Sequence, residues 1–257
     1  LMQKGLPELK FQEAIKIKGG KIYTMPKEKH NLFVVLKWLY HIMKNNHYEV
    51  IHINSDTAYV AAAYIYVAKK AKINKIFVHS HCTQIDDRCF FRRKIKILLH
   101  RFFISYVCEN TAMYLACSRL AGVWMFGEKN VKSINYKTIY NGVEVESYLF
   151  NQDIRKKYRA ELKLNKKYII GHIGRFSYQK NHEFIVDVFS AYQKKYAESI
   201  LVLVGTGELE NEVRKQVKEK RIENKVHFLG LRDDIPALLS MFDVLIMPSR
   251  FEGLPVT

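Results

Sequence analysis

Short apolar runs alternate with amphipathic segments along almost the whole chain. In the first half, apolar runs rich in β-branched residues predict strands at residues 21–25, 50–53 and 75–79. Between them, apolar positions recur with helical spacing at residues 32–46 and 57–71. Apolar strands separated by helices predict a parallel sheet that is covered on both faces.

The same alternation is clearer in the second half. Strands are predicted at residues 168–173, 200–204, 226–229 and 243–247, with helices at 182–196, 208–221 and 234–241. This order of strands and helices predicts a doubly wound, Rossmann-type α/β sheet. Ligands of such sheets bind outside the carboxyl ends of the strands.

A turn between the two sets of elements marks the predicted domain boundary. Asn141-Gly142 follows a short apolar strand, and an Asn-Gly step favours a turn. We therefore expect one Rossmann-like domain at residues 1–140 and a second at residues 141–257. Two domains joined in this way leave a cleft between them, and a ligand is expected there.

The charge of the chain is divided unevenly between these two parts. The 257 residues carry 42 basic and 25 acidic side chains, a net charge of +17. Residues 1–140 contribute 23 basic and 9 acidic side chains, whereas residues 141–257 contribute 19 and 16. This asymmetry predicts that the first half meets an anionic partner. Charge alone also fits a nucleic-acid-binding protein, but no recognition motif accompanies it, and we expect no nucleic-acid partner.

Cysteine usage and hydropathy bear on the cellular compartment. The four cysteines form no C-x-x-C pair and have no histidine at zinc-ligand spacing, so we expect reduced thiols in the cytoplasm and no metal. No apolar run reaches the length of about 20 residues that a membrane span needs. No signal peptide is recognisable at the start. The chain begins without methionine and ends within a motif, so we expect the natural protein to extend beyond both ends.

The loop after the strand at 168–173 carries the strongest functional signal. Its glycines lie at the carboxyl end of a strand, where the backbone can approach a ligand, and the next helix offers free N–H groups. Arg175 and Lys180 can add two cationic side chains to one diphosphate. The alternative is a surface loop with two solvated charges.

Two later segments are predicted at the same edge of the sheet. Gly205 and Gly207 follow the next strand. Alone they fit a tight turn equally well, but beside the preceding loop they fit a second backbone approach to a nucleotide. Glu252 follows the last strand. It is either a turn residue or a carboxylate that binds a sugar hydroxyl or balances positive charge at an anomeric carbon.

A pair of histidines ends a strand of the first half. We expect one imidazole of His79-Ser80-His81 to face the cleft and the other to face away. His81 lies further beyond the strand end and is the better candidate for a functional residue. A structural role is the more common one for a histidine at a strand end.

A basic segment with aromatic residues follows at residues 88–101. It contains six Arg and Lys side chains and no acidic residue, and large apolar residues are interleaved with them. Such a helix fits the surface of an anionic membrane. It fits equally well an ordinary helix that packs its apolar face on the sheet and keeps its charges in solvent.

These segments resemble the retaining family 4 glycosyltransferases of the GT-B fold, in particular the branch that makes capsular polysaccharide and exopolysaccharide. The matching motifs of the second half are Gly171-x-x-Gly174-Arg175-Phe176 with Lys180-Asn181-His182, Val204-Gly205-x-Gly207-Glu208-Leu209, Val226-x-Phe228-Leu229-Gly230, Asp243-Val244-x-x-x-Pro248-Ser249 and Phe251-Glu252-Gly253-Leu254-Pro255. Those of the first half are Val50-Ile51-His52, Val78-His79-Ser80-His81, Ala116-Cys117-Ser118, Phe126-Gly127 and Tyr140-Asn141-Gly142-Val143. The resemblance covers nearly the whole chain.

The resemblance implies a transferase that moves a sugar from a nucleotide-diphosphate donor, a UDP-sugar, with retention and without a metal or other cofactor. Arg175, Lys180 and the backbone of Gly174 would bind the departing diphosphate. Glu252 matches the first glutamate of the E-x7-E motif of the family, which contacts the transferred sugar. His81 matches a first-domain histidine near that sugar.

Further contacts are implied on both sides of the cleft. The base and ribose of the donor would lie along Gly205, Gly207 and the loop after Leu229, and the segment Phe251-Glu252-Gly253-Leu254 would complete the donor site. The acceptor, a polysaccharide glycan or a polyprenyl-diphosphate-linked sugar, would bind the more basic first domain. The protein would then be cytoplasmic and peripheral on the inner face of the plasma membrane.

The resemblance is incomplete at both ends of the chain. The second glutamate of E-x7-E would fall beyond residue 257, and the family's opening strand, its glycine-rich loop and its closing helices have no counterpart here. Both domains are therefore expected to be incomplete. Two other proteins of this architecture stay open at this point, a nucleotide-sugar 2-epimerase and a non-catalytic glycosyltransferase-like subunit.

Overall fold

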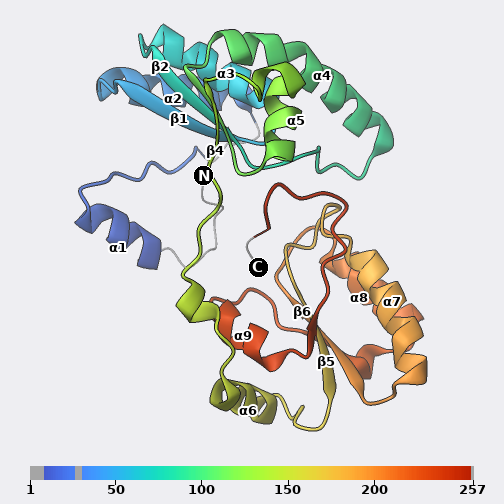
Figure 1. Cartoon of the computed structure of the whole chain (residues 1–257). Helices are drawn as coiled ribbons and strands as arrows, with labels where there is room; N and C mark the ends of the chain where they lie inside the picture. The colour runs from blue at the N-terminus through green and yellow to red at the C-terminus, as the bar shows by residue number, and fades with distance from the viewer. Residues whose placement is uncertain (1–8, 27–30, 256–257) are drawn as a thin grey trace.

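A computed structural model describes residues 9–26 and 31–255, and it contains two parallel four-stranded sheets, one in each half of the molecule (Figure 1). The first has the order β1-β2-β3-β4 and the second the order β7-β6-β5-β8. The strands are β1 (Val50–Ser55), β2 (Lys75–Ser80), β3 (Met113–Ala116), β4 (Tyr136–Thr138), β5 (Tyr168–Ile173), β6 (Ser199–Val204), β7 (Val226–Phe228) and β8 (Val244–Leu245).

Helices connect the strands in both halves, as the sequence pattern predicts. They are α1 (Leu9–Ile17), α2 (Leu32–Asn45), α3 (Ala58–Lys70), α4 (Phe90–Glu109), α5 (Arg119–Asn130), α6 (Gln152–Glu161), α7 (His182–Lys195), α8 (Glu210–Glu219) and α9 (Ile235–Met241), with short 3-10 turns η1 (Val145–Tyr148) and η2 (Glu223–Lys225). Within the described residues, none of the helices combines the length and the apolarity that crossing a bilayer requires.

The second sheet has a core on each face, because alternate residues of its buried strand β6 point to opposite sides. Leu201 and Leu203 pack with residues of α7 and α8. Ile200 and Val202 pack on the other face with residues of α9. This arrangement is the doubly wound sheet that the sequence predicts.

The first sheet is covered closely by α3, which is rich in alanine. Ala58, Ala61 and Ala68 are fully buried, and their small side chains join the same cluster as Ile76 and Val78 of β2. Helix α4 lies beside α3, and α5 lies beside α4, at the outside of this half (Figure 1). The loops after β1, β2 and β3 are thereby held at one edge of the sheet.

Residues 21–25 form no strand, so that prediction is wrong. The segment is held by side chains instead, because the Tyr23 hydroxyl donates to Asn46 Oδ1 (3.0 Å) and lies 3.2 Å from the hydroxyl of Tyr48. A strand needs a backbone partner, and within the described residues β1 pairs only with β2. The sheet is instead completed by β3, which the periodicity did not single out, and by β4, the short strand expected before Asn141.

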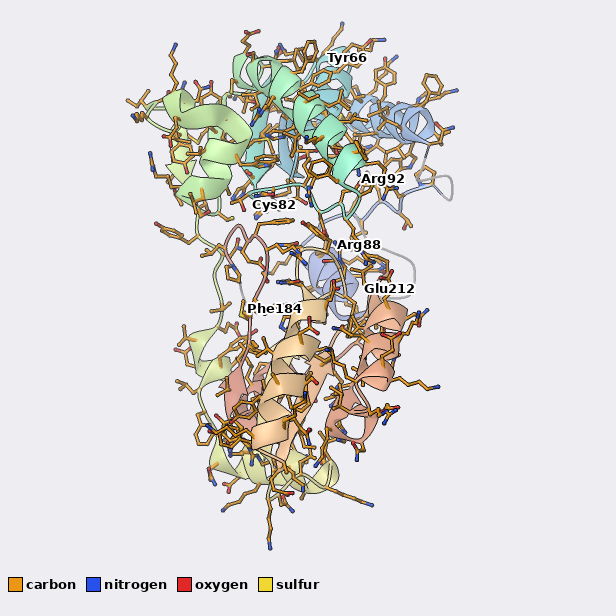
Figure 2. The ribbon with its side chains drawn as sticks, turned by 90° about the vertical axis from the view of Figure 1, so that its right-hand side faces the viewer. Tyr66, Cys82, Arg88, Arg92, Phe184 and Glu212 are labelled. Atoms are coloured by element: carbon orange, nitrogen blue, oxygen red, sulfur yellow. The ribbon has the colours of Figure 1, made fainter. Side chains whose placement is uncertain are left out.

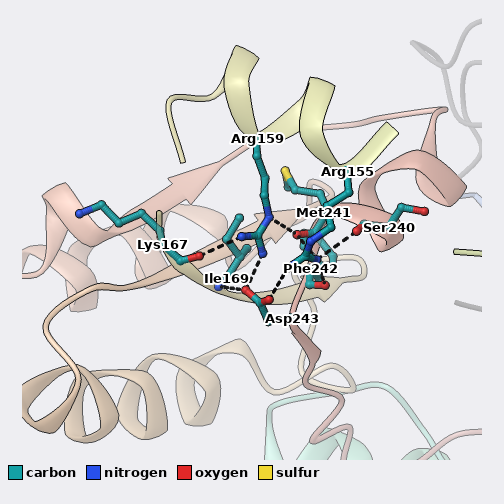
Figure 3. A network of polar contacts seen from close by, with 8 residues as sticks. All are labelled: Arg155, Arg159, Lys167, Ile169, Ser240, Met241, Phe242 and Asp243. Carbon is teal, nitrogen blue, oxygen red and sulfur yellow. Dashed lines mark hydrogen bonds and ion pairs between the residues drawn. The ribbon is translucent and has the colours of Figure 1, made fainter. Parts of the chain in front are cut away.

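A polar network closes the second sheet at the amino end of β5 (Figure 3). Asp243 accepts hydrogen bonds from the backbone N–H of Ile169 (2.7 Å), from Arg159 Nη2 (2.5 Å) and from Arg155. These contacts tie α6 to the segment that leads into β8. Residues 139–167 connect the two sheets, and the division at residues 140 and 141 stays a prediction.

Candidate active site between the two sheets

The loops that follow the strands of the two sheets meet in the middle of the molecule. Thr83, after β2, donates its hydroxyl to the carbonyl of Glu252 (3.0 Å), which follows β8. Arg88 pairs with Glu212, and Figure 2 shows this pair where the two halves approach each other. The carboxyl ends of both sheets therefore border one shared site, as expected for ligand sites in parallel α/β sheets.

The loop around Gly174 packs closely against the backbone of the loop at residues 204–207. The Gly174 N–H donates to the carbonyl of Val204 (2.9 Å). A Cβ atom at Gly205, whose φ is +128°, would lie 2.2 Å from the carbonyl oxygen of Gly174. A Cβ atom at Gly207 would lie 2.4 Å from that of Phe176. Both glycines are thus required by the close approach of two loops, and their contact with a ligand stays a prediction.

Lys180 and Glu252 form the centre of the site. Lys180 Nζ lies 2.8 Å from Glu252 Oε1, and the amide of Gln179 donates to Oε2 of the same carboxylate (3.2 Å). The two side chains of the pair are 17% and 22% exposed. An ion pair with little access to solvent interacts more strongly than one at the surface, so both charges are held in place near the cleft.

Arg175 reaches across to the first half and contacts Asp86. Its Nη2 lies 2.8 Å from Asp86 Oδ2, and the other carboxylate oxygen accepts from the backbone N–H of Gln179 (2.9 Å). The guanidinium side chain is 57% exposed and can still meet a ligand. Sequence reasoning missed Asp86 and Gln179. The available signal was an acidic residue in the loop after β2, within a half that is poor in acids.

His81 lies on the opposite wall, in a cavity of about 510 Å³ that residues of both halves line. Its Nε2 is 2.8 Å from Asn54 Oδ1, and its ring centroid is 4.1 Å from that of His79. The prediction that the two imidazoles face opposite ways is therefore wrong, because residues two positions apart along a strand lie on the same face. Burial lowers the pKa of His81, and the charge of Asp56 opposes that shift. Burial raises the pKa of Asp56, which lines the same cavity; the charges of His81 and Arg175 oppose this. This wall can donate and accept hydrogen bonds to hydroxyl groups.

The segment that carries Glu252 rests on the first half. Leu254 packs against Ala116 and Cys117, and its carbonyl accepts from the side chain of Asn141 (3.1 Å). Phe251 is buried, with 8% of its surface exposed. A Cβ atom at Gly253 would lie 1.9 Å from the carbonyl oxygen of His81. Of the predicted donor residues, Gly253 and Leu254 therefore approach or contact the first half.

The predicted site residues otherwise gather at one edge of the second sheet. Lys180 and Glu252 are in contact, and Gly174, Arg175, Gly205 and Gly207 belong to the two interlocked loops beside them. Leu229 lies one strand further out, where its N–H donates to the carbonyl of Leu203 (2.9 Å). Within the described residues, no group of three or more His, Cys, Asp or Glu side chains is arranged to hold a metal ion.

Some of the basic side chains at residues 88–101 form contacts within the molecule. Asp87 accepts from Lys96 (2.7 Å) and Arg92 (3.1 Å) at the start of α4. The guanidinium of Arg93 lies 4.9 Å from the ring centroid of Tyr178, which belongs to the second half. The first turns of α4 thus contribute to the contact between the halves.

A match to a known protein family covers most of the second half of the chain. Residues 153–257 match the family of glycosyl transferases group 1. The second half of the chain is a glycosyl transferases group 1 domain. Arg175, Lys180 and Glu252 all lie in this group 1 domain, whereas His81 and Asp86 precede it.

Two curated relatives match over most of the chain. EpsF of Bacillus subtilis (strain 168) is 28% identical over 251 residues, which cover 96% of this chain and 64% of EpsF. The UDP-Gal:alpha-D-GlcNAc-diphosphoundecaprenol alpha-1,3-galactosyltransferase of Escherichia coli is 23% identical over 223 residues, which cover 85% of this chain and 56% of that enzyme. The chain thus spans less than two thirds of the length of both relatives.

A solved structure shares the arrangement of the two sheets. Anabaena HepE in complex with UDP-glucose superimposes with a TM-score of 0.71 at 20% identity, over 93% of this chain and 63% of HepE. At this identity the similarity establishes the fold alone. The group 1 domain and the preceding half together have the GT-B architecture that the sequence predicts.

Proposed function

We propose that this chain belongs to a retaining glycosyltransferase that transfers a sugar from a UDP-sugar to a glycan or a polyprenyl-diphosphate-linked acceptor in the synthesis of surface polysaccharide. The observation that carries the proposal is the Lys180–Glu252 pair beside Arg175, in the cleft at the carboxyl end of β5. The Escherichia coli relative is named for UDP-Gal and a diphosphoundecaprenol acceptor, and HepE was solved with UDP-glucose. These names support the proposed donor and acceptor classes.

The second half would hold the donor. Arg175 and Lys180 would bind the diphosphate, whose negative charge grows as the bond to the anomeric carbon breaks and its electrons pass to the leaving oxygen. The backbone of Gly174 would let the diphosphate approach closely, although its N–H is already bonded to the carbonyl of Val204. No metal is part of this proposal, because the two cations supply the positive charge. Glu252 would accept hydrogen bonds from hydroxyl groups of the transferred sugar. Donors fixed before the reaction stabilise such charge without reorganisation.

The first half would hold the acceptor. The cavity beside His81 combines the imidazole with Asn54 and Asp56, which can bind sugar hydroxyl groups. It opens next to Arg175, so an acceptor hydroxyl there would approach the anomeric carbon of a donor bound to the second half. We expect the enzyme to work in the cytoplasm, peripheral on the inner face of the plasma membrane, where lipid-linked acceptors are available.

The test is a screen of the full-length protein against a panel of nucleotide sugars with and without a lipid-linked acceptor. Arg175→Ala is expected to lower turnover on the order of 10²-fold or more, because the leaving diphosphate loses a positioned cation. Lys215→Ala, on the exposed side of α8, is the matched control and should retain wild-type turnover. Conversion of the donor to its epimer without acceptor, or no turnover of any nucleotide sugar, would contradict the proposal.

A further inference from the structure

Helix α4 presents a row of large apolar side chains to solvent. Phe91, Ile95, Leu98 and Phe102 are spaced by four, three and four residues, so they lie on one face of the helix. Their exposed fractions are 75%, 59%, 64% and 77%. We refer to these four residues as the α4 stripe. A monomeric soluble protein rarely leaves such a contiguous apolar surface uncovered without a binding role.

The α4 stripe is not the face that packs on the sheet. The buried residues of α4 are His100 and Val107, on the opposite side of the helix. His100 Nδ1 accepts from the N–H of Ala58 (2.9 Å), and its ring stacks on Trp124 with centroids 3.9 Å apart. These contacts fix the rotation of α4 about its axis. Packing on the sheet therefore explains one side of the helix and leaves the stripe unexplained.

Basic side chains border the stripe on both sides. At 100° per residue, exposed Lys94 and Arg101 lie on one flank, and Arg92, which also contacts Asp87, lies on the other. No acidic residue occurs between Arg88 and Cys108. Lysine is depleted in protein–protein interfaces, whereas apolar side chains flanked by Lys and Arg are typical of helices that lie in the surface of an anionic bilayer. Charge complementarity thus favours lipid head groups over a protein partner.

We infer that the α4 stripe docks on an anionic lipid bilayer, with Phe91, Ile95, Leu98 and Phe102 inserted among the acyl chains and the flanking cations at the phosphate level. This inference deepens the proposed function, because it specifies how a lipid-linked acceptor reaches the site. Lys96, on the side of α4 that faces away from the stripe, lines the cavity that contains His81. A bilayer on the stripe would therefore lie one helix diameter, roughly 10 Å, from this cavity, on the half proposed to bind the acceptor. The first turns of α4, which carry Arg92, lie near the middle of the molecule (Figure 2).

The test is flotation of the full-length protein with vesicles of phosphatidylcholine alone and of phosphatidylcholine with roughly one third phosphatidylglycerol. We expect binding to the anionic vesicles that weakens with salt. Replacing all four stripe residues by Ser should abolish it, and these exposed positions tolerate polar side chains. Replacing Lys94 and Arg101 by Gln should weaken vesicle binding roughly 25-fold, because each cation near the surface contributes about fivefold.

Matched controls change similar side chains elsewhere. Phe184→Ser with Val188→Ser removes two exposed apolar residues one turn apart on α7, in the half that carries no such basic border. Lys215→Gln with Lys218→Gln removes two cations from α8. Both controls are expected to float as the wild type does. Undiminished flotation of the stripe variant, or equal loss in the α7 control, would overturn the inference.

Two further measurements separate the possible failures. Sedimentation velocity shows whether the stripe joins two copies of the protein; a stripe-dependent dimer that does not float would overturn the inference. Titration of UDP into the wild type and the stripe variant is expected to give equal affinities, because no stripe residue lies at the donor loops. Absence of UDP binding in both would count against the proposed function, and flotation would still decide the role of α4.

Discussion

Two networks of charged side chains lie at opposite ends of the same strand, β5. At its amino end, Asp243 pairs with Arg155 and Arg159 inside the second half (Figure 3). At its carboxyl end, Glu252 pairs with Lys180 beside the first half. The chemistry of the two networks is nearly the same, but their surroundings differ.

The network at the amino end is closed. Arg159 is buried, and its remaining N–H groups donate to the carbonyls of Met241 (3.0 Å) and Lys167 (3.1 Å). Burial acts to raise the pKa of Asp243, but hydrogen bonds from Ile169, Arg155 and Arg159 outweigh it and lower that pKa. A buried network in which every group is satisfied holds the fold together and leaves nothing for a ligand.

The network at the carboxyl end is open to the cleft. Its members come from loops of both halves, and Arg175 keeps more than half of its side chain in solvent. Asp86 pairs with Arg175 and Glu252 pairs with Lys180, so a diphosphate that binds these cations would have to share or replace the two carboxylates. The comparison teaches that position in the fold, and not residue type, separates a structural ion pair from a ligand site.

The largest effect is expected at the closed network. Asp243→Ala leaves the buried guanidinium of Arg159 and the partly exposed guanidinium of Arg155 without their carboxylate, and we expect the free energy of unfolding to fall by about 3–5 kcal/mol. The measurement is the urea midpoint and slope. Glu198→Ala is the matched control, because the Lys167–Glu198 pair lies at the same end of the sheet with its carboxylate 69% exposed, and it should cost less than about 1 kcal/mol. Equal losses in the two variants would show that the Asp243 network stabilises the fold no more than an exposed ion pair does.

The open network is expected to respond in turnover more than in stability. Lys180→Ala should lower turnover by about 100-fold, because a cation that meets the leaving diphosphate is lost. Steady-state kinetics with saturating donor and the urea midpoint are measured on the same preparation. A variant that loses stability as Asp243→Ala does while keeping its turnover would show that both networks are structural.

Low pH is expected to lower the stability of the fold through His182, the first residue of α7, which lies near Lys180 of the open network. Burial, with the nearby His172 and Lys180, lowers its pKa to about 3. An unfolded histidine titrates near its ordinary pKa of about 6.5, so the stability due to neutral His182 is complete above that pH and is lost as the pH falls toward 3.

Between about pH 7 and pH 5, His182 alone should lower the free energy of unfolding by about 2 kcal/mol. His182→Phe removes the titrating group, and its aromatic ring can replace the imidazole that stacks on Phe176. Urea unfolding at several pH values should therefore show a shallower loss in the variant than in the wild type. If the variant and the wild type lost the same stability over this pH range, His182 would not be the group responsible.

The smallest effect is expected at the exposed pair that joins the halves. Arg88 and Glu212 are 55% and 57% exposed, so Arg88→Gln should change the free energy of unfolding by less than about 1 kcal/mol. Turnover should stay close to that of the wild type. A strong loss of turnover would mean that contact between the halves, and not only the open network, controls the reaction.

Local sequence patterns predicted most of the fold of the second half. The buried run at residues 200–204 could only be an apolar strand of a covered sheet, and β6 occupies Ser199–Val204. In the first half, residues 21–25 have a strand-like composition but no neighbouring strand in the described chain. Pairing is a long-range property, so composition alone could not exclude this strand.

The candidate site was predictable where it depends on the ends of strands. The chain order places Lys180 and Glu252 after β5 and β8, which pair in the sheet, and their 2.8 Å contact follows from that neighbourhood. Asp86 could not be found in this way. Its contacts with Arg175 and Gln179 join residues 89 and 93 positions apart in different halves, and no local pattern encodes how two halves approach each other.

The lack of a side chain at Gly253 has a mechanical consequence. Because a methyl group there would collide with the backbone of His81, even alanine would act as a wedge between the halves. The segment that carries this glycine is also tied to the second half, because the N–H of Arg250 donates to the carbonyl of Gln179 (2.8 Å) and the Gln179 side chain donates to the carbonyl of Phe251 (3.0 Å). A hinge motion that separates the halves would therefore open the contacts with His81 and Thr83, whereas Lys180 and Glu252 would move together as one charged unit.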